Sequence, residues 1–146
     1  HMSKIHFVKI LPSDFKLESI MTKLMDFESY PEFMPSQLKQ VRILKNDQNG
    51  TITEETITFH SIIKKTFIQQ TLHKKTANSL NSKIIAGPAK NTQVTVIFEE
   101  NEGKPTIIVD CDIKLSLAMR VFEPLIKKYY KTYINAFLNR LAISTI

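Results

Sequence analysis

Glu55 and His73 are the titratable side chains of this sequence best placed for acid–base chemistry. Glu55 shares the two-residue alternation of Ile57 and Phe59, and His73 shares that of Phe67. Side chains two residues apart lie on one face of a strand, so both groups are candidates for the inner wall of a sheet. An inward acid or base of shifted pKa is what proton-transfer catalysis requires. Strand alternation gives the face of the sheet on which a residue lies but not how deeply it is buried. We therefore favour positions at the sheet edge, or hydrogen-bonded positions in the wall, for both residues.

Other signatures of enzymes are missing from the sequence. It has no G-x-S-x-G, P-loop or G-x-G-x-x-G motif, which argues against an elbow serine and a phosphate cradle. His6, His60 and His73 lack the spacing of a metal site. Asp110 and Asp112 form a carboxylate pair, but they share the polar face of a predicted strand and are expected to be solvated. We therefore predict no catalytic residue and no metal ligand, and we favour a binding protein over an enzyme.

Three tyrosines near the carboxyl end could carry polar contacts to a ligand. Tyr129, Tyr130 and Tyr133 accompany Phe122 and Phe137 on the predicted last helix. Plain core packing and a pocket wall are both consistent with this set. A buried tyrosine hydroxyl needs a partner, and apolar pockets often present one polar tip to a ligand. Our hypothesis is that Tyr129 or Tyr133 offers its hydroxyl to a ligand head group.

Composition favours one domain, expected over residues 3–146, with His1-Met2 as a cloning remnant at the native start. Lys and Arg total 20 against 14 Asp and Glu, a net charge of +6. Such a charge could favour anionic membranes or RNA, but an ordinary solvated surface is the preferred interpretation. Cys111 is the single cysteine, so no intramolecular disulfide forms. Because no secretion signal and no apolar run of about 18 residues occurs, a cytoplasmic protein is expected.

Hydrophobic periodicity predicts a strand, a helix, a short turn or helix, about six further strands and a long final helix. Asn49-Gly50, Gly87-Pro88 and Glu102-Gly103 mark the turns between strands. The first strand covers Lys4 to Leu11, and Pro12-Ser13-Asp14 provides a stop and a candidate N-cap. The remaining elements are expected at Ser13–Asp26, around Tyr30–Pro35 and Val41–Ile43, and at Thr51–Ser61, Lys64–Lys75, Asn78–Ala86, Thr92–Glu99, Pro105–Leu115 and Leu117–Ala142.

The last strand and last helix indicate how these elements pack. One face of the last strand is apolar and is expected to be shielded from solvent (a dry face); it carries Ile107, Val109, Cys111, Ile113 and Leu115. The final helix has a broad apolar face, and the dry side of the sheet is the large partner available to it. We therefore predict an α+β helix-grip fold, in which a curved antiparallel sheet of about seven strands wraps around the last helix and leaves a cavity. The apolar helix face consists of Phe122, Ile126, Tyr129, Tyr133, Phe137 and Leu141.

The segment from Asp26 to Pro35 resembles the D-x-E-x-Y-P-x-F-x-P signature of the coenzyme Q-binding START-like proteins. These are grouped with polyketide cyclase/dehydrase domains and ribosome-associated toxin relatives. Gly87-Pro88 and the A-F-x-x-R motif that begins at Ala136 agree with the resemblance. Ser36-Gln37 and the absence of tryptophan depart from the family pattern, so the identity of the ligand does not carry over.

The resemblance implies binding or transport of a lipid or isoprenoid quinone, with no cofactor other than such a bound molecule. A ribosome-associated regulator and a small polyketide cyclase or dehydratase stay open as alternatives. Membrane or ribosome contact would use basic residues such as Lys64, Lys65, Lys127, Lys128 and Lys131, and no specific DNA binding is expected. Phe33 and Met34 are candidates for a gate at the cavity mouth. The predicted ligand-binding residues are Tyr30, Phe33, Met34, Phe59, Phe67, Val96, Phe98, Val109, Cys111, Phe122, Ile126, Tyr129, Tyr133 and Phe137.

Overall fold

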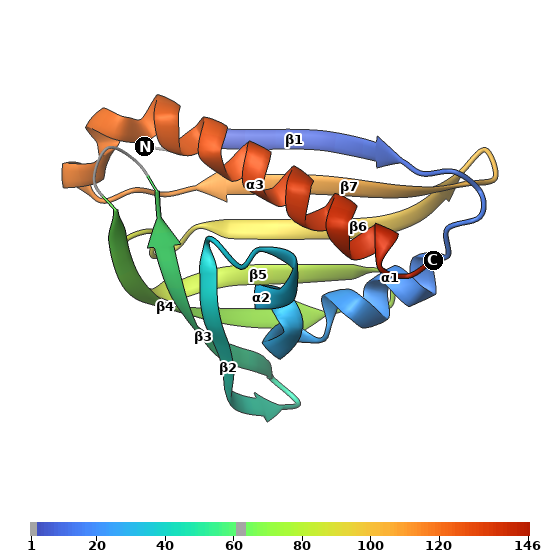
Figure 1. Cartoon of the computed structure of the whole chain (residues 1–146), viewed down its shortest axis with the longest axis horizontal. Coiled ribbons are helices and arrows are strands. Elements are labelled where there is room, and N and C mark those ends of the chain that lie inside the picture. Colours follow the sequence, from blue (N-terminus) through green and yellow to red (C-terminus); the bar gives the residue numbers. More distant parts are fainter. Residues whose placement is uncertain (1–2, 61–63) are drawn as a thin grey trace.

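Seven strands form one antiparallel sheet in the order β1-β7-β6-β5-β4-β3-β2, and the long helix α3 lies across one of its faces (Figure 1). The computed structural model describes residues 3–60 and 64–146; His1-Met2 and Ser61, the last residue of one predicted strand, lie outside this range. The strands are β1 (Ser3–Ile10), β2 (Leu38–Asp47), β3 (Gly50–Phe59), β4 (Lys65–Lys75), β5 (Ser79–Ala86), β6 (Gln93–Asn101) and β7 (Lys104–Ile113).

The strands from β2 to β7 form a meander of consecutive neighbours, and β1 closes the sheet beside β7. The three predicted turns are confirmed: each joins two adjacent strands at its glycine. Gly50 is required at the first turn, because its φ is +128° and a Cβ there would lie 2.5 Å from the carbonyl oxygen of His73. The turn at Gly50 sets β2 against β3, and the other two turns set β5 against β6 and β6 against β7.

The first helix is shorter than its periodicity predicts. We expected Ser13–Asp26, but α1 covers Leu17–Leu24. The amide of Phe15 donates to the carbonyl of Pro12, so these residues form a turn, and the extended Lys16 precedes the helix without a side-chain cap. The 3₁₀ helix η1 (Phe27–Ser29) and α2 (Tyr30–Phe33) follow, which confirms a short helical segment between the first helix and the main run of strands.

The final helix also begins later than predicted. A continuous helix was expected from Leu117, but the structure has a 3₁₀ helix, η2 (Leu117–Phe122), and then α3 (Glu123–Ile143). Pro124 explains the break, since proline is tolerated only in the first turn of an α-helix. As a result, Leu117, Val121 and Phe122 are 53–79% exposed instead of packing on the sheet.

The core lies between the sheet and the carboxyl-terminal half of α3. Ile107, Val109 and Ile113 of β7 are at most 1% exposed, as are Leu138 and Leu141 of α3. The predicted dry face of the last strand is therefore confirmed, and so is the helix-grip arrangement. No helix among the described residues is long and apolar enough to cross a membrane.

Candidate functional site

A cavity of about 450 Å³ lies between the inner face of the sheet and α3. Most of its wall is apolar, and its polar residues gather on β3, β4 and β5. Such a volume is within the usual range for small-molecule sites. The lining residues are Leu24, Tyr30, Leu38, Glu55, Ile57, Phe59, Lys65, Thr66, Phe67, Gln69, Thr71, His73, Leu80, Ser82, Ile84, Pro88, Ala89, Val94, Val96, Leu115, Met119, Ile126, Tyr129, Tyr130, Tyr133, Ile134, Phe137 and Leu138.

The predicted ligand-binding set divides into two groups. The structure brings eight of its residues together in the cavity wall: Tyr30, Phe59, Phe67, Val96, Ile126, Tyr129, Tyr133 and Phe137. Phe98, Val109 and Cys111 are buried in the hydrophobic core and do not line the cavity. Phe122 is 53% exposed on η2 and is not part of the lining.

Phe33 and Met34, the proposed gate residues, do not lie at the open end of the cavity. Met34 is 3% exposed in the core, and the Phe33 ring packs edge-on against Phe137 with 6.0 Å between centroids. The Arg140 guanidinium donates to the carbonyl oxygen of Phe33 over 2.8 Å. This ties α2 to the carboxyl-terminal end of α3, whereas the exposed lining residues Lys65 and Pro88 lie at the opposite, open end of the cavity. The expectation of a gate at Phe33 and Met34 is therefore corrected.

Glu55 is the centre of the polar wall. Its side chain is buried, and it accepts hydrogen bonds at Oε1 from the Thr71 hydroxyl and from Gln69 Nε2, the latter over 3.3 Å. The Thr53 hydroxyl donates to Oε2 over 3.2 Å. Sheet register explains this cluster, because Glu55 pairs with Gln69 and Thr53 pairs with Thr71 on the same face.

His73 extends the cluster toward the closed end of the cavity. Its Nε2 lies 2.8 Å from Thr53 Oγ1 and its Nδ1 lies 2.7 Å from Ser82 Oγ. Phe27 covers the imidazole, with the two rings stacked at 4.1 Å between centroids and 18° between planes. Glu55, Thr53, His73 and Ser82 thus form an unbroken chain of hydrogen-bonding groups along the cavity wall.

Burial shifts the pKa values of both titratable groups toward their neutral forms. Desolvation raises the pKa of Glu55 to about 7, although the three hydrogen bonds to its carboxylate act in the opposite direction. Desolvation lowers the pKa of His73 to about 4. Glu55 therefore changes charge near neutral pH, while His73 stays uncharged there. Both residues have the inward orientation that strand parity predicted, and both are hydrogen-bonded wall residues.

The helix side of the cavity is aromatic. Tyr129 stacks with Tyr133 at 5.9 Å between centroids and meets Phe59 at 4.7 Å. The hydroxyl of Tyr129 is buried, and among the described residues it has no hydrogen-bond partner. Burial raises the pKa of Tyr129 and that of Tyr133, so both hydroxyls keep their protons at neutral pH. Tyr129 can thus donate a hydrogen bond to a ligand oxygen.

Four polar residues around Glu55 and His73 were not identified as site residues from the sequence: Thr53, Gln69, Thr71 and Ser82. Thr53 has the same parity as Glu55, a signal that could have found it. Ser82 has no such signal, because its role depends on the pairing of β4 with β5, which sets it opposite His73. The carboxylate pair behaves as predicted at Asp110, which is exposed and lies 2.6 Å from His6 Nδ1; Asp112 is half-buried.

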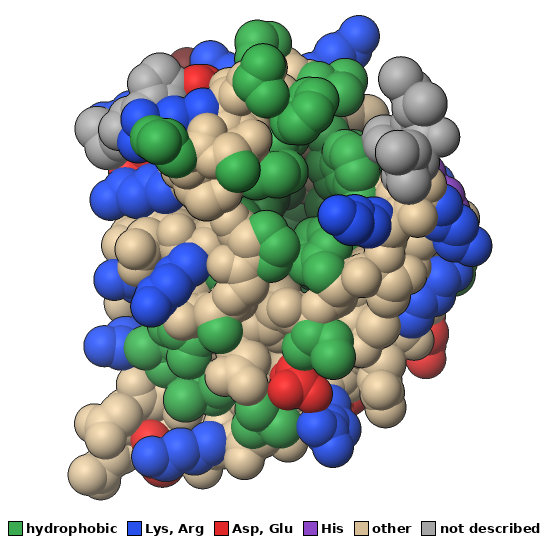
Figure 2. All heavy atoms as spheres, turned by 90° about the vertical axis from the view of Figure 1, so that its left-hand side faces the viewer, with side chains coloured by type: hydrophobic (Ala, Val, Ile, Leu, Met, Phe, Trp, Pro, Cys, Tyr) green, Lys and Arg blue, Asp and Glu red, His purple; other side chains and the backbone are tan. Residues whose placement is uncertain are grey.

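The open end of the cavity is flanked by exposed apolar side chains. Leu117, Val121, Phe122 and Leu125 are more than half exposed on η2 and at the start of α3. Figure 2 shows this end of the molecule, with a hollow lined by hydrophobic side chains and with Lys and Arg side chains around it. A ligand would enter the cavity at this end.

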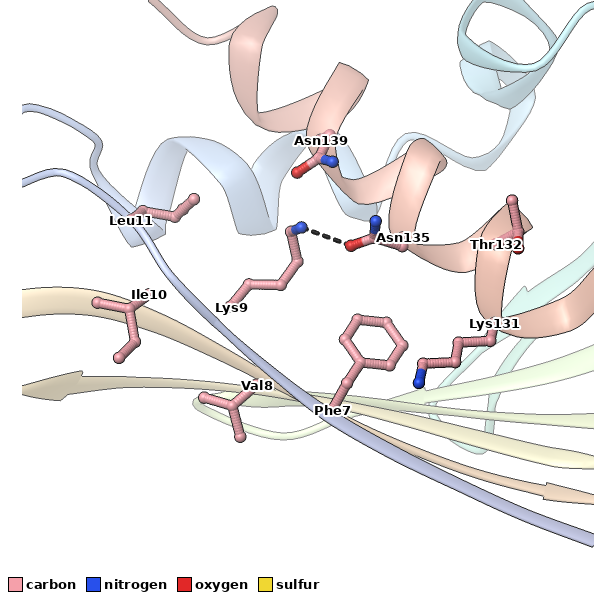
Figure 3. A pocket seen from close by; sticks show the side chains of 9 residues that line it. All are labelled: Phe7, Val8, Lys9, Ile10, Leu11, Lys131, Thr132, Asn135 and Asn139. Atoms are coloured by element: carbon pink, nitrogen blue, oxygen red, sulfur yellow. Dashed lines mark hydrogen bonds between the residues drawn. The ribbon is translucent and has the colours of Figure 1, made fainter. Parts of the chain in front are cut away.

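A second hollow of about 500 Å³ lies on the other side of α3, beside the edge strand β1 (Figure 3). None of its lining residues lines the cavity described above. Lys9 crosses it, and its Nζ donates to Asn135 Oδ1 over 2.6 Å. Because this bond bridges β1 and α3 across the open side, we assign the hollow to the junction of the two elements and not to a ligand site.

A curved sheet that wraps around a long helix and leaves a largely apolar cavity between them defines a helix-grip protein of the START and Bet v 1 type. The chain belongs to the family of polyketide cyclases/dehydrases and lipid transport proteins, which residues 14–142 match. The family and the fold fit binding of a hydrophobic ligand or polyketide cyclase/dehydrase activity. The START-like resemblance of the sequence is thereby confirmed.

Solved structures support the same fold. A START superfamily protein from Mycobacterium smegmatis has a TM-score of 0.73 and 18% identity, with 99% of this chain and 97% of that chain covered. The Zhui aromatase/cyclase from Streptomyces sp. R1128 has a TM-score of 0.73 and 11% identity, with 97% and 94% covered. The protein TTHA0849 from Thermus thermophilus has a TM-score of 0.76 and 10% identity, with 98% and 97% covered. No curated protein sequence matches the chain.

Proposed function

We propose that the protein binds, and carries or protects, a hydrophobic small molecule such as a lipid or an isoprenoid-quinone-like compound. The observation that supports this is the cavity of about 450 Å³ with a mostly apolar wall. That volume equals about 15 water molecules at about 30 Å³ each, enough for a fused-ring compound or a short chain. Burying apolar ligand surface contributes about 25 cal/mol per Å², so the apolar part of the ligand supplies most of the affinity.

A variant that fills the cavity tests this proposal. Ile57 lines the cavity, whereas Ile68 lies on the outer face of the adjacent strand and is 59% exposed. Ile57→Trp should abolish binding of the fluorescent probe 1-N-phenylnaphthylamine, and the matched control Ile68→Trp should retain it. Native mass spectrometry of the gently purified protein should show a bound lipid in the control alone. Equal probe binding by the two variants would place the ligand outside the cavity and refute the proposal.

Small-molecule cyclase or dehydratase activity is a second candidate. It is favoured by one observation, the buried Glu55 in the cavity wall with a pKa of about 7, close to the value that suits a general acid or base. Turnover of a poly-β-keto thioester by the wild type, lost in Glu55→Gln, would support an enzyme. Binding of the same compound without turnover would support a carrier.

Contact with an anionic membrane surface would load such a ligand. Exposed apolar side chains on η2 and basic residues at the open end, among them Lys65 and Lys128, have the composition of an interfacial surface. Flotation with vesicles of phosphatidylcholine and phosphatidylglycerol should recover the wild type and lose Leu117→Ser/Phe122→Ser. Ribosome contact and a cytoplasmic location stay predictions; co-sedimentation with ribosomes at low salt tests the former.

A further inference from the structure

We propose that Glu55 and its hydrogen-bond partners form a binding site for an alcohol or phenol hydroxyl on the ligand. This inference rests on the proposed function and adds to it the chemical class of the head group. The ligand is thus an amphipathic molecule whose hydroxyl lies against β3 and β4, with its apolar remainder toward the open end. Nothing in the family assignment or in the fold specifies this group.

One of the four hydrogen-bond acceptor positions of the Glu55 carboxylate is free to receive a donor from a ligand. A carboxylate has two oxygens with two acceptor positions each. Oε1 already receives the Thr71 hydroxyl and the Gln69 amide, so it is fully used. Oε2 receives the Thr53 hydroxyl alone among the described residues. Because Glu55 lines the cavity, the remaining position on Oε2 is open to a ligand donor.

The strand residues Thr53, His73 and Ser82 have no proton to offer that position. Thr53 gives its single proton to Oε2, so its oxygen accepts from the Nε2–H of His73. In this tautomer His73 Nδ1 is unprotonated and accepts from the Ser82 hydroxyl. Every proton of the chain Ser82–His73–Thr53 is therefore committed in the direction of Glu55. An alcohol or phenol on the ligand supplies a donor for this position.

Charge excludes an acidic head group at the same place. A ligand carboxylate would bring a second negative charge against a desolvated carboxylate, which disfavours both ionised forms. A hydroxyl is neutral, and its hydrogen bond to an ionised acceptor is about twice as strong as one to a neutral acceptor. Affinity for a hydroxyl should therefore rise as Glu55 loses its proton.

Glu55 is the titrating group of this site around neutral pH. His73, which faces it through Thr53 from β4, is neutral above its pKa of about 4. The tyrosines that face it from α3 and α2 have pKa values raised by burial and stay protonated; they are Tyr130, Tyr133 and Tyr30. Glu54, the adjacent residue on β3, is paired with Arg42 over 2.8 Å on the outer face. Its pKa is lowered, mainly by the hydrogen bond from Arg42, so its charge does not change in this range.

The position of Glu55 along its strand fixes the ligand's direction. It lies four residues inward from Phe59, about 13 Å at 3.3 Å per residue. Between the two lies the apolar pair of Ile57 and Phe67, which are partners in the sheet register. A hydroxyl at Glu55 therefore leaves the apolar body of the ligand against Ile57, Phe59 and Phe67, with Tyr129 above it on α3.

Two compounds of nearly equal shape test the hydroxyl site: 2-naphthol, and 2-methylnaphthalene as the matched control. Both are titrated as competitors of 1-N-phenylnaphthylamine at about pH 6 and about pH 8, where 2-naphthol stays protonated as phenols do. With a Glu55 pKa of about 7, the ionised fraction rises from about one tenth to about nine tenths. The affinity of the wild type for 2-naphthol relative to 2-methylnaphthalene should rise up to about tenfold over this range.

Two variants separate the site from the cavity itself. In Glu55→Gln the relative affinity should be the same at both pH values while 2-methylnaphthalene still binds, which also shows that the variant is folded. In Glu54→Gln, the control on the outer face, the pH-dependent rise should persist. A flat profile in the wild type, or a rise that persists in Glu55→Gln, would overturn the hydroxyl site while leaving the cavity as an apolar site. Failure of both naphthalenes and of the probe to bind would refute the proposed function, and the hydroxyl site with it.

Discussion

Replacing Glu55 with glutamine is expected to stabilise the fold above pH 7, because it removes a carboxylate that has to ionise inside the protein. The pKa of Glu55 is about 7 in the folded chain against an ordinary 4.5. A raised carboxyl pKa favours the fold fully below pH 4.5, and that contribution is lost as the pH rises through 7. The pKa difference corresponds to about 3 kcal/mol at about 1.4 kcal/mol per pKa unit.

The amide of the variant can keep the local hydrogen bonds. Its oxygen accepts from Thr71 and Gln69, and its NH₂ group donates to Thr53. Thr53 then donates to Nε2 of His73, and the Nδ1–H of the opposite tautomer donates to Ser82. Since the whole chain can reverse its direction, no buried polar group is left without a partner, and the change in charge dominates the effect.

Urea unfolding at pH 5 and pH 8 measures this effect. Linkage predicts that Glu55→Gln exceeds the wild type by less than about 1 kcal/mol at pH 5 and by about 3 kcal/mol at pH 8. The lowered pKa of His73 affects both proteins equally and cancels in the difference. Glu54→Gln is the control with the opposite sign, because the pKa of Glu54 is lowered by Arg42. An equal difference at the two pH values would show that Glu55 ionises normally, and would refute the assignment of a desolvated carboxyl.

Three further outcomes follow from burial and backbone geometry. Tyr129→Phe removes a buried hydroxyl without a partner among the described residues and should raise the free energy of unfolding by about 1 kcal/mol, measured in urea; a loss of stability would mean that the hydroxyl is satisfied. Gly50→Ala should lower stability by more than about 2 kcal/mol, because its Cβ would lie 2.5 Å from the His73 carbonyl oxygen. Gly103→Ala is the control: nothing lies within 4 Å of its Cβ, so it should cost only the strain of its positive φ, about 1 kcal/mol. Equal melting temperatures of the two variants would contradict this prediction. Cys111, 2% exposed and with its pKa raised to about 12, should react with iodoacetamide at least about a thousandfold more slowly in the folded than in the unfolded chain, and labelling at similar rates would show that the thiol is accessible.

Particular elements show where sequence reasoning succeeds and where it fails. The alternation of β7 predicted a dry face because an extended strand has a fixed period of two. The same rule identified Glu55 and His73 as inward residues. The helix boundaries were less accurate, since Phe15 and Phe122 fit a helical period but lie outside the α-helices, where the Pro12 turn and Pro124 decide the backbone.

Depth within the fold was the main source of error in the candidate site. Phe98, Val109 and Cys111 have the parity of pocket residues, yet they lie in solid core. Val96 and Phe67 have the same kind of pattern and line the cavity. Periodicity gives the face of a strand on which a residue lies, but the distance between that face and the helix depends on the curvature of the sheet.

The element order, the turn positions, the apolar strand faces and the family could be predicted from the sequence, because these depend on local spacing and on short motifs. The convergence of Thr53, Gln69 and Thr71 on Glu55 could not be predicted in this way, nor could the position of His73 between Ser82 and Phe27. These contacts come from strands paired across turns and from segments far apart in the chain. The proton-binding behaviour of Glu55 follows from that convergence and from its burial, which no local pattern contains.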